Sequence, residues 1–177
     1  MRLKVLVVGA CKSGKTRVAN VLSEAVEDTG VCSPTQGVRI LEYEPATTFA
    51  NKWVAELWDC SGHQRFESCM PALQHGAHAA ILVVDPCKAE AARAAADRFS
   101  PLLANRPPGQ AHALVVLLPS GPFPASPPLR LTGAWIEARQ LRADLAADGG
   151  QQLRRDVATF LSDVAAVASD RDEFSFA

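Results

Sequence analysis

Residues 9–16, GACKSGKT, have the residue types and spacing of a phosphate-binding loop, G-x-x-x-x-G-K-[ST]. The segment follows an apolar run and precedes a helical pattern, so that backbone N–H groups and the positive end of the helix dipole can bind phosphate oxygens. In this pattern Lys15 reaches the β- and γ-phosphates, and the Thr16 hydroxyl ligates Mg²⁺. The competing interpretation is a glycine-rich turn that caps the helix, which the strand and helix context disfavours. The sequence therefore predicts a site for a nucleoside triphosphate and magnesium.

Two further segments could complete this site. Asp59 stands at the end of a β-rich run, where its carboxylate can hold magnesium directly or through water, and Gly62 would let its N–H approach the γ-phosphate. Thr35 lies between the first helical pattern and the next strand, and could offer its hydroxyl to magnesium and its N–H to the γ-phosphate. Each pattern is weak alone, since ordinary turns explain both. Their position after the phosphate-binding loop makes the site interpretation stronger.

These segments give a set of candidate residues. The predicted metal ligands are Thr16, Thr35 and Asp59. The predicted nucleotide contacts are Gly9, Cys11, Lys12, Ser13, Gly14, Lys15, Thr16, Thr35 and Gly62.

Apolar, β-rich runs alternate with helical patterns along the chain, which is typical of a parallel sheet covered by helices. A hairpin is expected from the second and third strands, and five prolines in residues 119–128 exclude a regular helix there. For the sixth strand, residues 138–142 are favoured over 129–131, because a short connection then leads to the last helix. The predicted strands are residues 3–8, 38–43, 53–58, 79–84, 113–118 and 138–142. The predicted helices are residues 15–27, 89–103 and 151–168.

The composition suits one ordinary globular domain of 177 residues, with 48% hydrophobic and 21% charged residues. A net charge of -1 gives no general reason to bind nucleic acid. Five cysteines without a C-x-x-C pair favour free thiols over a disulfide framework or a zinc knuckle. No signal peptide, bilayer-spanning run or lipidation motif is recognisable, so we expect a soluble protein with no direct lipid anchor. We expect a domain at residues 1–169 and a flexible tail at 170–177.

The order and spacing of the three segments are those of a Ras-like small GTPase, with switch I at residues 29–37 and switch II at 59–71. Two positions argue for slow hydrolysis. His63 follows Gly62 where the water-orienting glutamine is expected, and could replace it only poorly as a catalytic residue; the competing interpretation is an exposed loop residue. Cys11 and Lys12 replace two glycines of Ras and would crowd the γ-phosphate.

The base-reading motif N-K-x-D is absent after the fifth predicted strand, where the chain reads Pro119-Ser120-Gly121. No aspartate is available there to accept from guanine, so ATP binding remains open. Asp144, in the last loop, could contribute, but no motif supports it.

The runs SPTQGVRILEYE (33–44), ELWDCSG (56–62) and FESCMPAL (66–73) resemble the Rab-like small GTPase subunits of the intraflagellar transport B complex, the Rab-like protein five family. The resemblance covers residues 3–84 well and continues weakly beyond them. Ser61 and His63 depart from the glycine and acid that are usual in the family. The fold that it implies is a Ras-like P-loop G domain, a six-stranded, mostly parallel α/β sheet with helices on both faces and a Pro-rich loop in place of the fourth helix.

The resemblance also implies an atypical GTPase that binds GTP or GDP with Mg²⁺ and hydrolyses little. Such a protein docks on coiled-coil subunits of the complex in the cytoplasm, at the basal body and in the cilium or flagellum. Candidate partner contacts are Val38, Ile40, Trp53 and Phe66, unless they only pack the sheet. The alternatives are an active GTPase switch that exchanges partners with nucleotide state and a P-loop protein that binds ATP as well. A small kinase is least favoured, because no arginine cluster follows the central helix.

Overall fold

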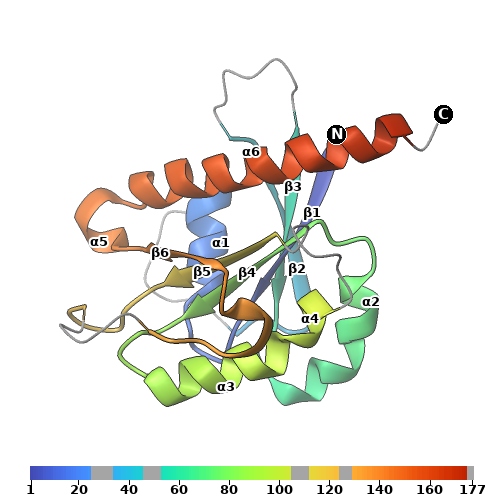
Figure 1. Ribbon diagram of the computed structural model, residues 1–177. Helices are drawn as coiled ribbons and strands as arrows, with labels where there is room; N and C mark the ends of the chain where they lie inside the picture. Colours follow the sequence, from blue (N-terminus) through green and yellow to red (C-terminus); the bar gives the residue numbers. More distant parts are fainter. Residues whose placement is uncertain (25–33, 46–52, 105–111, 124–128, 175–177) are drawn as a thin grey trace.

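The computed structural model describes residues 1–24, 34–45, 53–104, 112–123 and 129–174, with the backbone alone for 104 and 170–174. Six strands form one sheet in the order β2-β3-β1-β4-β5-β6 (Figure 1). The strands are β1 (Arg2–Val8), β2 (Val38–Tyr43), β3 (Val54–Cys60), β4 (Ala79–Val84), β5 (Ala113–Leu117) and β6 (Arg139–Arg142). The helices are α1 (Lys15–Ser23), η1 (Gln64–Cys69), α2 (Met70–Gln74), α3 (Ala89–Phe99), α4 (Pro101–Ala104), η2 (Gly133–Trp135), α5 (Leu145–Asp148) and α6 (Gln151–Phe174).

Among the six strands of the described residues, only the β2–β3 pair is antiparallel, and every other neighbouring pair is parallel. The predicted hairpin and the mostly parallel sheet are therefore confirmed. β1 lies between β3 and β4. The connection after β1 leads to β2 and β3 on one side of it, and the connection after β3 leads to β4 on the other side, so connections run in opposite directions from the carboxyl end of β1. In open α/β sheets, ligands bind beyond the carboxyl ends of the strands at such a point.

Alternating side chains of each strand pack into two cores, one on each face of the sheet. On one face, α1 and α6 cover Leu3, Val5 and Val7 of β1, with Val157 and Leu161 contributed by α6. On the other face, α3, α4 and η2 cover Leu6, Val8, Leu82, Val84 and Val115, with Trp135 buried among them. Figure 1 shows α6 and α3 on opposite sides of the sheet. Helices on both faces are thus confirmed.

Several predicted element boundaries require correction. The first helix ends at Ser23 and not at residue 27, because Glu24 adopts a left-handed conformation with φ 52° and closes it. The predicted helix 89–103 divides into α3 and α4 at Ser100, since Pro101 has no N–H with which to continue the hydrogen-bond ladder. The sixth strand lies at Arg139–Arg142, within the favoured candidate.

The last helix continues to Phe174, past its predicted end at residue 168. The expected tail at 170–177 therefore overlaps this helix as far as Phe174, while 175–177 lie outside the described residues. A domain boundary at residue 169 stays a prediction.

Between β5 and β6, the described residues 118–123 and 129–138 contain one short 3-10 turn, η2, and no α-helix. A loop in place of the fourth helix is therefore confirmed for this part of the chain, and the remaining prolines, at 124–128, lie outside it. Within the described residues, no helix is both long enough and apolar enough to cross a bilayer.

Candidate phosphate and magnesium site

The loop between β1 and α1 has a backbone that only certain residues can adopt. Gly9 has φ 150°, and a Cβ there would lie 2.3 Å from the carbonyl oxygen of Val83. Gly14, with φ 88°, precedes the first turn of α1. Lys12 adopts φ 61° without being glycine. Strained residues of this kind concentrate at functional sites, which agrees with a loop shaped to bind a ligand.

Three side chains predicted to hold magnesium come together at the end of the sheet. The Thr16 hydroxyl donates to Oδ2 of Asp59 at 2.9 Å, and the Thr35 hydroxyl donates to the same oxygen at 3.0 Å. The two hydroxyl oxygens lie 2.9 Å apart. Neighbouring oxygens around an octahedral Mg²⁺ with bonds of 2.0–2.1 Å are about 2.9 Å apart. The three oxygens therefore have the spacing of one face of a magnesium coordination shell.

The carboxylate of Asp59 is fully buried, and its second oxygen, Oδ1, has no hydrogen-bond partner. A buried oxygen of this kind needs a donor or a cation. Among the described residues, no group of three or more His, Cys, Asp or Glu side chains could hold a metal ion. The site thus offers one carboxylate and two hydroxyls, and a magnesium ion here would take its other ligands from water or phosphate oxygens.

Lys15 lies beneath the loop with 6% of its surface exposed, and its Nζ donates to the carbonyl oxygen of Ala10 at 2.7 Å. Burial lowers the pKa of Lys15, and the nearby carboxylate of Asp59 acts in the opposite direction. A buried ammonium with one neutral acceptor is suited to bind an anion that enters the loop.

Gly62 lies directly against the phosphate-binding loop. A Cβ on Gly62 would be 2.6 Å from the carbonyl oxygen of Gly9 and 2.7 Å from the backbone nitrogen of Cys11, so only glycine fits. On its other side, the carbonyl oxygen of Gly62 accepts a 2.7 Å hydrogen bond from Nη1 of Arg98, on α3. Sequence reasoning did not identify Arg98, because nothing in the spacing of α3 indicates which switch II residue it contacts.

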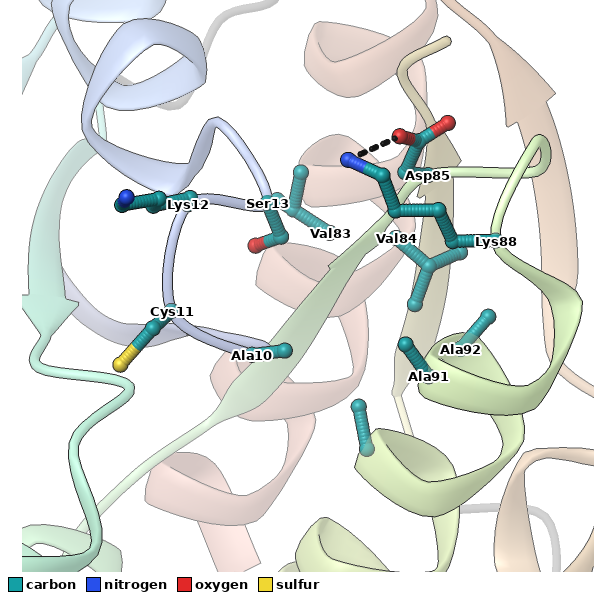
Figure 2. A pocket seen from close by; sticks show the side chains of 11 residues that line it. Ala10, Cys11, Lys12, Ser13, Val83, Val84, Asp85, Lys88, Ala91 and Ala92 are labelled. Carbon is teal, nitrogen blue, oxygen red and sulfur yellow. Dashed lines mark ion pairs between the residues drawn. The ribbon is translucent and has the colours of Figure 1, made fainter. Parts of the chain in front are cut away.

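Cys11, Lys12 and Ser13 face different surroundings. Cys11 and Lys12 are exposed, and their side chains point away from α3 (Figure 2). Ser13 is buried, and its hydroxyl has no hydrogen-bond partner. Residues of the loop, the end of β4 and the start of α3 enclose a pocket beside Ser13 (Figure 2). Its lining is Ala10, Cys11, Lys12, Ser13, Val83, Val84, Asp85, Lys88, Ala91, Ala92 and Ala95.

Asp85 organises the loop that stands in place of N-K-x-D. Its Oδ1 accepts the backbone N–H groups of Cys87 and Ser120, and its Oδ2 pairs with Lys88 at 3.1 Å. Burial by itself would raise the pKa of Asp85, but the hydrogen bonds from Ser120, Cys87 and Lys88 outweigh it and hold the pKa at about 2. Asp144 is also occupied, because its Oδ1 accepts the N–H groups of Ala146 and Ala147 at the start of α5.

His63 is exposed and takes part in a local turn. Its Nδ1 accepts the backbone N–H of Arg65 at 3.2 Å, and its own N–H donates to Oγ of Ser61 at 3.3 Å. These are the contacts of a residue that caps η1. His63 therefore has a structural role independent of any catalytic one.

The four candidate partner contacts divide into three groups. Trp53 is buried in the core that α1 and α6 cover, so its prediction as a partner contact is wrong: it packs the sheet. Ile40 is 49% exposed on the edge strand β2. Val38 and Phe66 are half-buried. Ile40 is therefore the most exposed of the four candidate contacts.

The sequence profile of the family described as "Ras of Complex, Roc, domain of DAPkinase" matches residues 4–116. The chain belongs to the Roc domain family. This Roc-family chain is 52% identical over 87 residues to "Intraflagellar transport protein 22 homolog" from Homo sapiens, covering 47% of the chain and 46% of that protein. It is 42% identical over 90 residues to the protein of the same name from Danio rerio, covering 48% of each.

The matched region of the Roc-family chain spans about half the length of these relatives. A chain of the solved structure "T. brucei IFT22/74/81 GTP-bound crystal structure" aligns with a TM-score of 0.72 and 23% identity, covering 97% of this chain and 99% of that one. At that identity the match establishes the Ras-like fold, which was predicted from the sequence.

Proposed function

We propose that this Roc-family chain binds guanine nucleotide, as GTP or GDP, together with Mg²⁺. The observation that carries the proposal is the convergence of Thr16, Thr35 and Asp59 at 2.9–3.0 Å. The proposed metal ligands are Thr16, Thr35 and Asp59. The proposed nucleotide contacts are Gly9, Cys11, Lys12, Ser13, Gly14, Lys15, Thr16, Thr35 and Gly62.

Each residue around the proposed Mg²⁺ and phosphate positions has a role that its contacts suggest. Both threonine hydroxyls direct their protons to Asp59, which leaves their lone pairs free for a cation. Bound Mg²⁺ would supply positive charge to the phosphate oxygens. Lys15 would supply a second positive charge from beneath the loop, and the backbone N–H of Gly62, held against the loop, would face the terminal phosphate.

We further propose that intrinsic hydrolysis is slow or absent. Nδ1 of His63 already accepts a hydrogen bond within its own turn, so this nitrogen is not free to take a proton from an attacking water molecule. Cys11 and Lys12, which stand where Ras has two glycines, would crowd the terminal phosphate and any inserted arginine. Nucleotide would then support folding or docking more than turnover.

The proposed partners are coiled-coil subunits of the intraflagellar transport B complex. Two observations support this: the relatives named for intraflagellar transport, and the exposed Ile40 on the edge strand next to the switch segments. Assembly there would place the chain in the cytoplasm, at the basal body and in the cilium or flagellum, where it would contribute to cilium assembly. An active switch that exchanges partners with nucleotide state is the alternative.

A second candidate, binding of ATP as well as GTP, is favoured by the base side of the site. The loop after β5 offers Pro119, Ser120 and Gly121, which carry no carboxylate. Oδ1 of Asp144 accepts two backbone N–H groups as a helix cap. If the described loops supply no directed acceptor for the guanine N–H groups, discrimination between the bases would be weak.

Identification of co-purifying nucleotide tests these proposals. The purified protein is denatured, and the released nucleotide is separated by chromatography. Guanine nucleotide in the wild type, absent from Lys15→Ala, is the expected result, whereas adenine nucleotide would favour the second candidate. If both proteins release none and neither binds added GTP, the proposed function is wrong. A single-turnover assay on GTP-loaded protein then measures hydrolysis, for which a rapid rate without a partner would contradict the slow-turnover proposal.

A further inference from the structure

Arg39 lies next to the buried carboxylate of the candidate metal site. In the antiparallel register of β2 and β3, Arg39 is the partner of Asp59. Its Nη2 is 3.6 Å from Oδ2 of Asp59 and also donates a hydrogen bond to Oδ1 of Asn20, on α1. The guanidinium group of Arg39 therefore connects β2 to Asp59 of β3 and to α1.

Burial makes this contact consequential. Asp59 is fully buried, and a buried carboxylate without a nearby positive charge is strongly unfavourable. The hydroxyls of Thr16 and Thr35 donate hydrogen bonds to it but bring no charge. The ion pair with Arg39 brings that charge from this chain itself.

The two oxygens of Asp59 are used unequally. Oδ2 receives both threonine hydroxyls and lies nearest Arg39, whereas Oδ1 has no hydrogen-bond partner. Arg39 approaches Oδ2, the oxygen with the magnesium-like spacing to the two hydroxyls, from 3.6 Å, and Oδ1 keeps its lone pairs free, so the carboxylate can bind a magnesium ion or its water while it is paired with Arg39. Asp59 can therefore interact with Arg39 and with a bound Mg²⁺ at the same time.

We propose that Arg39 is a positioning residue that acts as a permanent counter-cation for Asp59. It keeps Asp59 and the two threonine hydroxyls in place when Mg²⁺ is absent, and it makes nucleotide retention less dependent on Mg²⁺. This inference rests on the proposed function, because it concerns how the same site holds guanine nucleotide. Without Arg39, the charge of Asp59 would be offset only by Mg²⁺ and by the nearby ammonium of Lys15, which the proposed function assigns to the phosphates.

The test measures release of a fluorescent GDP, N-methylanthraniloyl-GDP, in Mg²⁺ and in EDTA. The ratio of the two rates reports the dependence on Mg²⁺. In Arg39→Gln the ratio should rise about tenfold over that of the wild type, as expected for loss of one charge at close range in a partly solvated site. Arg39→Lys, which retains the charge, should restore most of the difference. Arg155→Gln, on the exposed face of α6, is the matched control and should leave the ratio unchanged.

Thermal unfolding without nucleotide or metal provides the second readout. Arg39→Gln should unfold at a lower temperature than the wild type, and Arg39→Gln with Asp59→Asn should recover much of the loss, because the uncompensated charge is gone. A ratio within twofold of the wild type overturns the inference. It is equally overturned if the double variant is as unstable as Arg39→Gln, since Arg39 would then act through Asn20 or packing. A wild type that retains no nucleotide even in Mg²⁺ refutes the proposed function instead, and the unfolding comparison still decides the role of Arg39.

Discussion

The hydroxyl of Thr35 donates to Oδ2 of Asp59 at 3.0 Å, although one residue precedes β2 and the other lies near the end of β3. This contact connects the described part of switch I to the start of switch II. Thr16, from the first turn of α1, contacts the same oxygen. Residues from three separate segments of the chain therefore meet at one carboxylate oxygen before any ligand is considered.

Thr16→Ala removes one oxygen from this arrangement. Because the hydroxyl would bind the metal and also orients Asp59, Mg²⁺-dependent affinity for GTP should fall by about 10–100-fold. Affinity in EDTA should change much less. Equilibrium titration of fluorescent GTP in both buffers measures the two values. Thr159→Ala, on the exposed face of α6, is the control. Equal losses in Mg²⁺ and EDTA would contradict the assignment of Thr16 to the metal.

Asp85→Asn tests the loop that replaces the base-reading motif. The pKa of Asp85 is held at about 2, below its ordinary value of 3.8, so its charged form stabilises the fold at pH above about 4 and this contribution disappears as the pH falls toward 2. The contribution at neutral pH is about 2 kcal/mol.

Chemical denaturation at pH 7 and pH 2.5 measures this difference. The free energy of unfolding of Asp85→Asn should lie below that of the wild type at pH 7, and the two should approach each other at pH 2.5. Asp163→Asn, on the exposed face of α6, should differ from the wild type by less than about 0.5 kcal/mol at pH 7. A constant gap between wild type and Asp85→Asn at both pH values would show that the charge of Asp85 is not what stabilises the loop.

His63→Ala separates a capping role from a catalytic one. General acid–base groups contribute typically about 100-fold or more to a rate. Since His63 accepts a hydrogen bond from its own turn, single-turnover GTP hydrolysis should change by less than about threefold. Gln64→Ala, one residue later and also exposed, serves as the comparison. A hundredfold loss confined to His63→Ala would identify His63 as catalytic.

Ile40→Asp tests the proposed partner surface on β2. A charge placed in an interface that buries Ile40 has to be desolvated, so affinity for the coiled-coil subunits should fall more than about tenfold. Ile136→Asp is the matched control, because Ile136 is also exposed and lies between η2 and β6, the strand at the opposite edge of the sheet from β2. Pull-down of purified partners with both variants gives the comparison. Equal binding by Ile40→Asp and the wild type would place the partner elsewhere.

The sequence predicted those features that depend on local residue types. The phosphate-binding loop, Asp59 and Gly62 follow from spacing, and the buried strands follow from apolar runs such as that of β4. The division of the predicted helix 89–103 at Pro101 was missed because the apolar pattern continues across this residue. A proline is also tolerated in the first turn of a helix, as it is at the start of α4, so its presence alone did not indicate two helices.

Other features depend on register, which the sequence alone does not specify. Arg39 pairs with Asp59 only because β2 and β3 are aligned in this way, and a shift of one residue would turn Arg39 to the other face of the sheet. The contact between Arg98 and Gly62 depends in the same way on how α3 packs on the sheet. Trp53 remained a candidate partner contact, with packing of the sheet as the alternative, because strand alternation did not reveal which face the first residue of the run would take.

Calorimetric titration of nucleotide-free protein with GTP in the presence of Mg²⁺ tests the central claim most directly. The account predicts saturable one-to-one binding by the wild type and at least about a hundredfold weaker binding by Lys15→Ala, since the buried ammonium would lie against the phosphates. Arg155→Ala should bind as the wild type does. Absence of saturable binding by the wild type, or equal affinity in Lys15→Ala, would contradict the account.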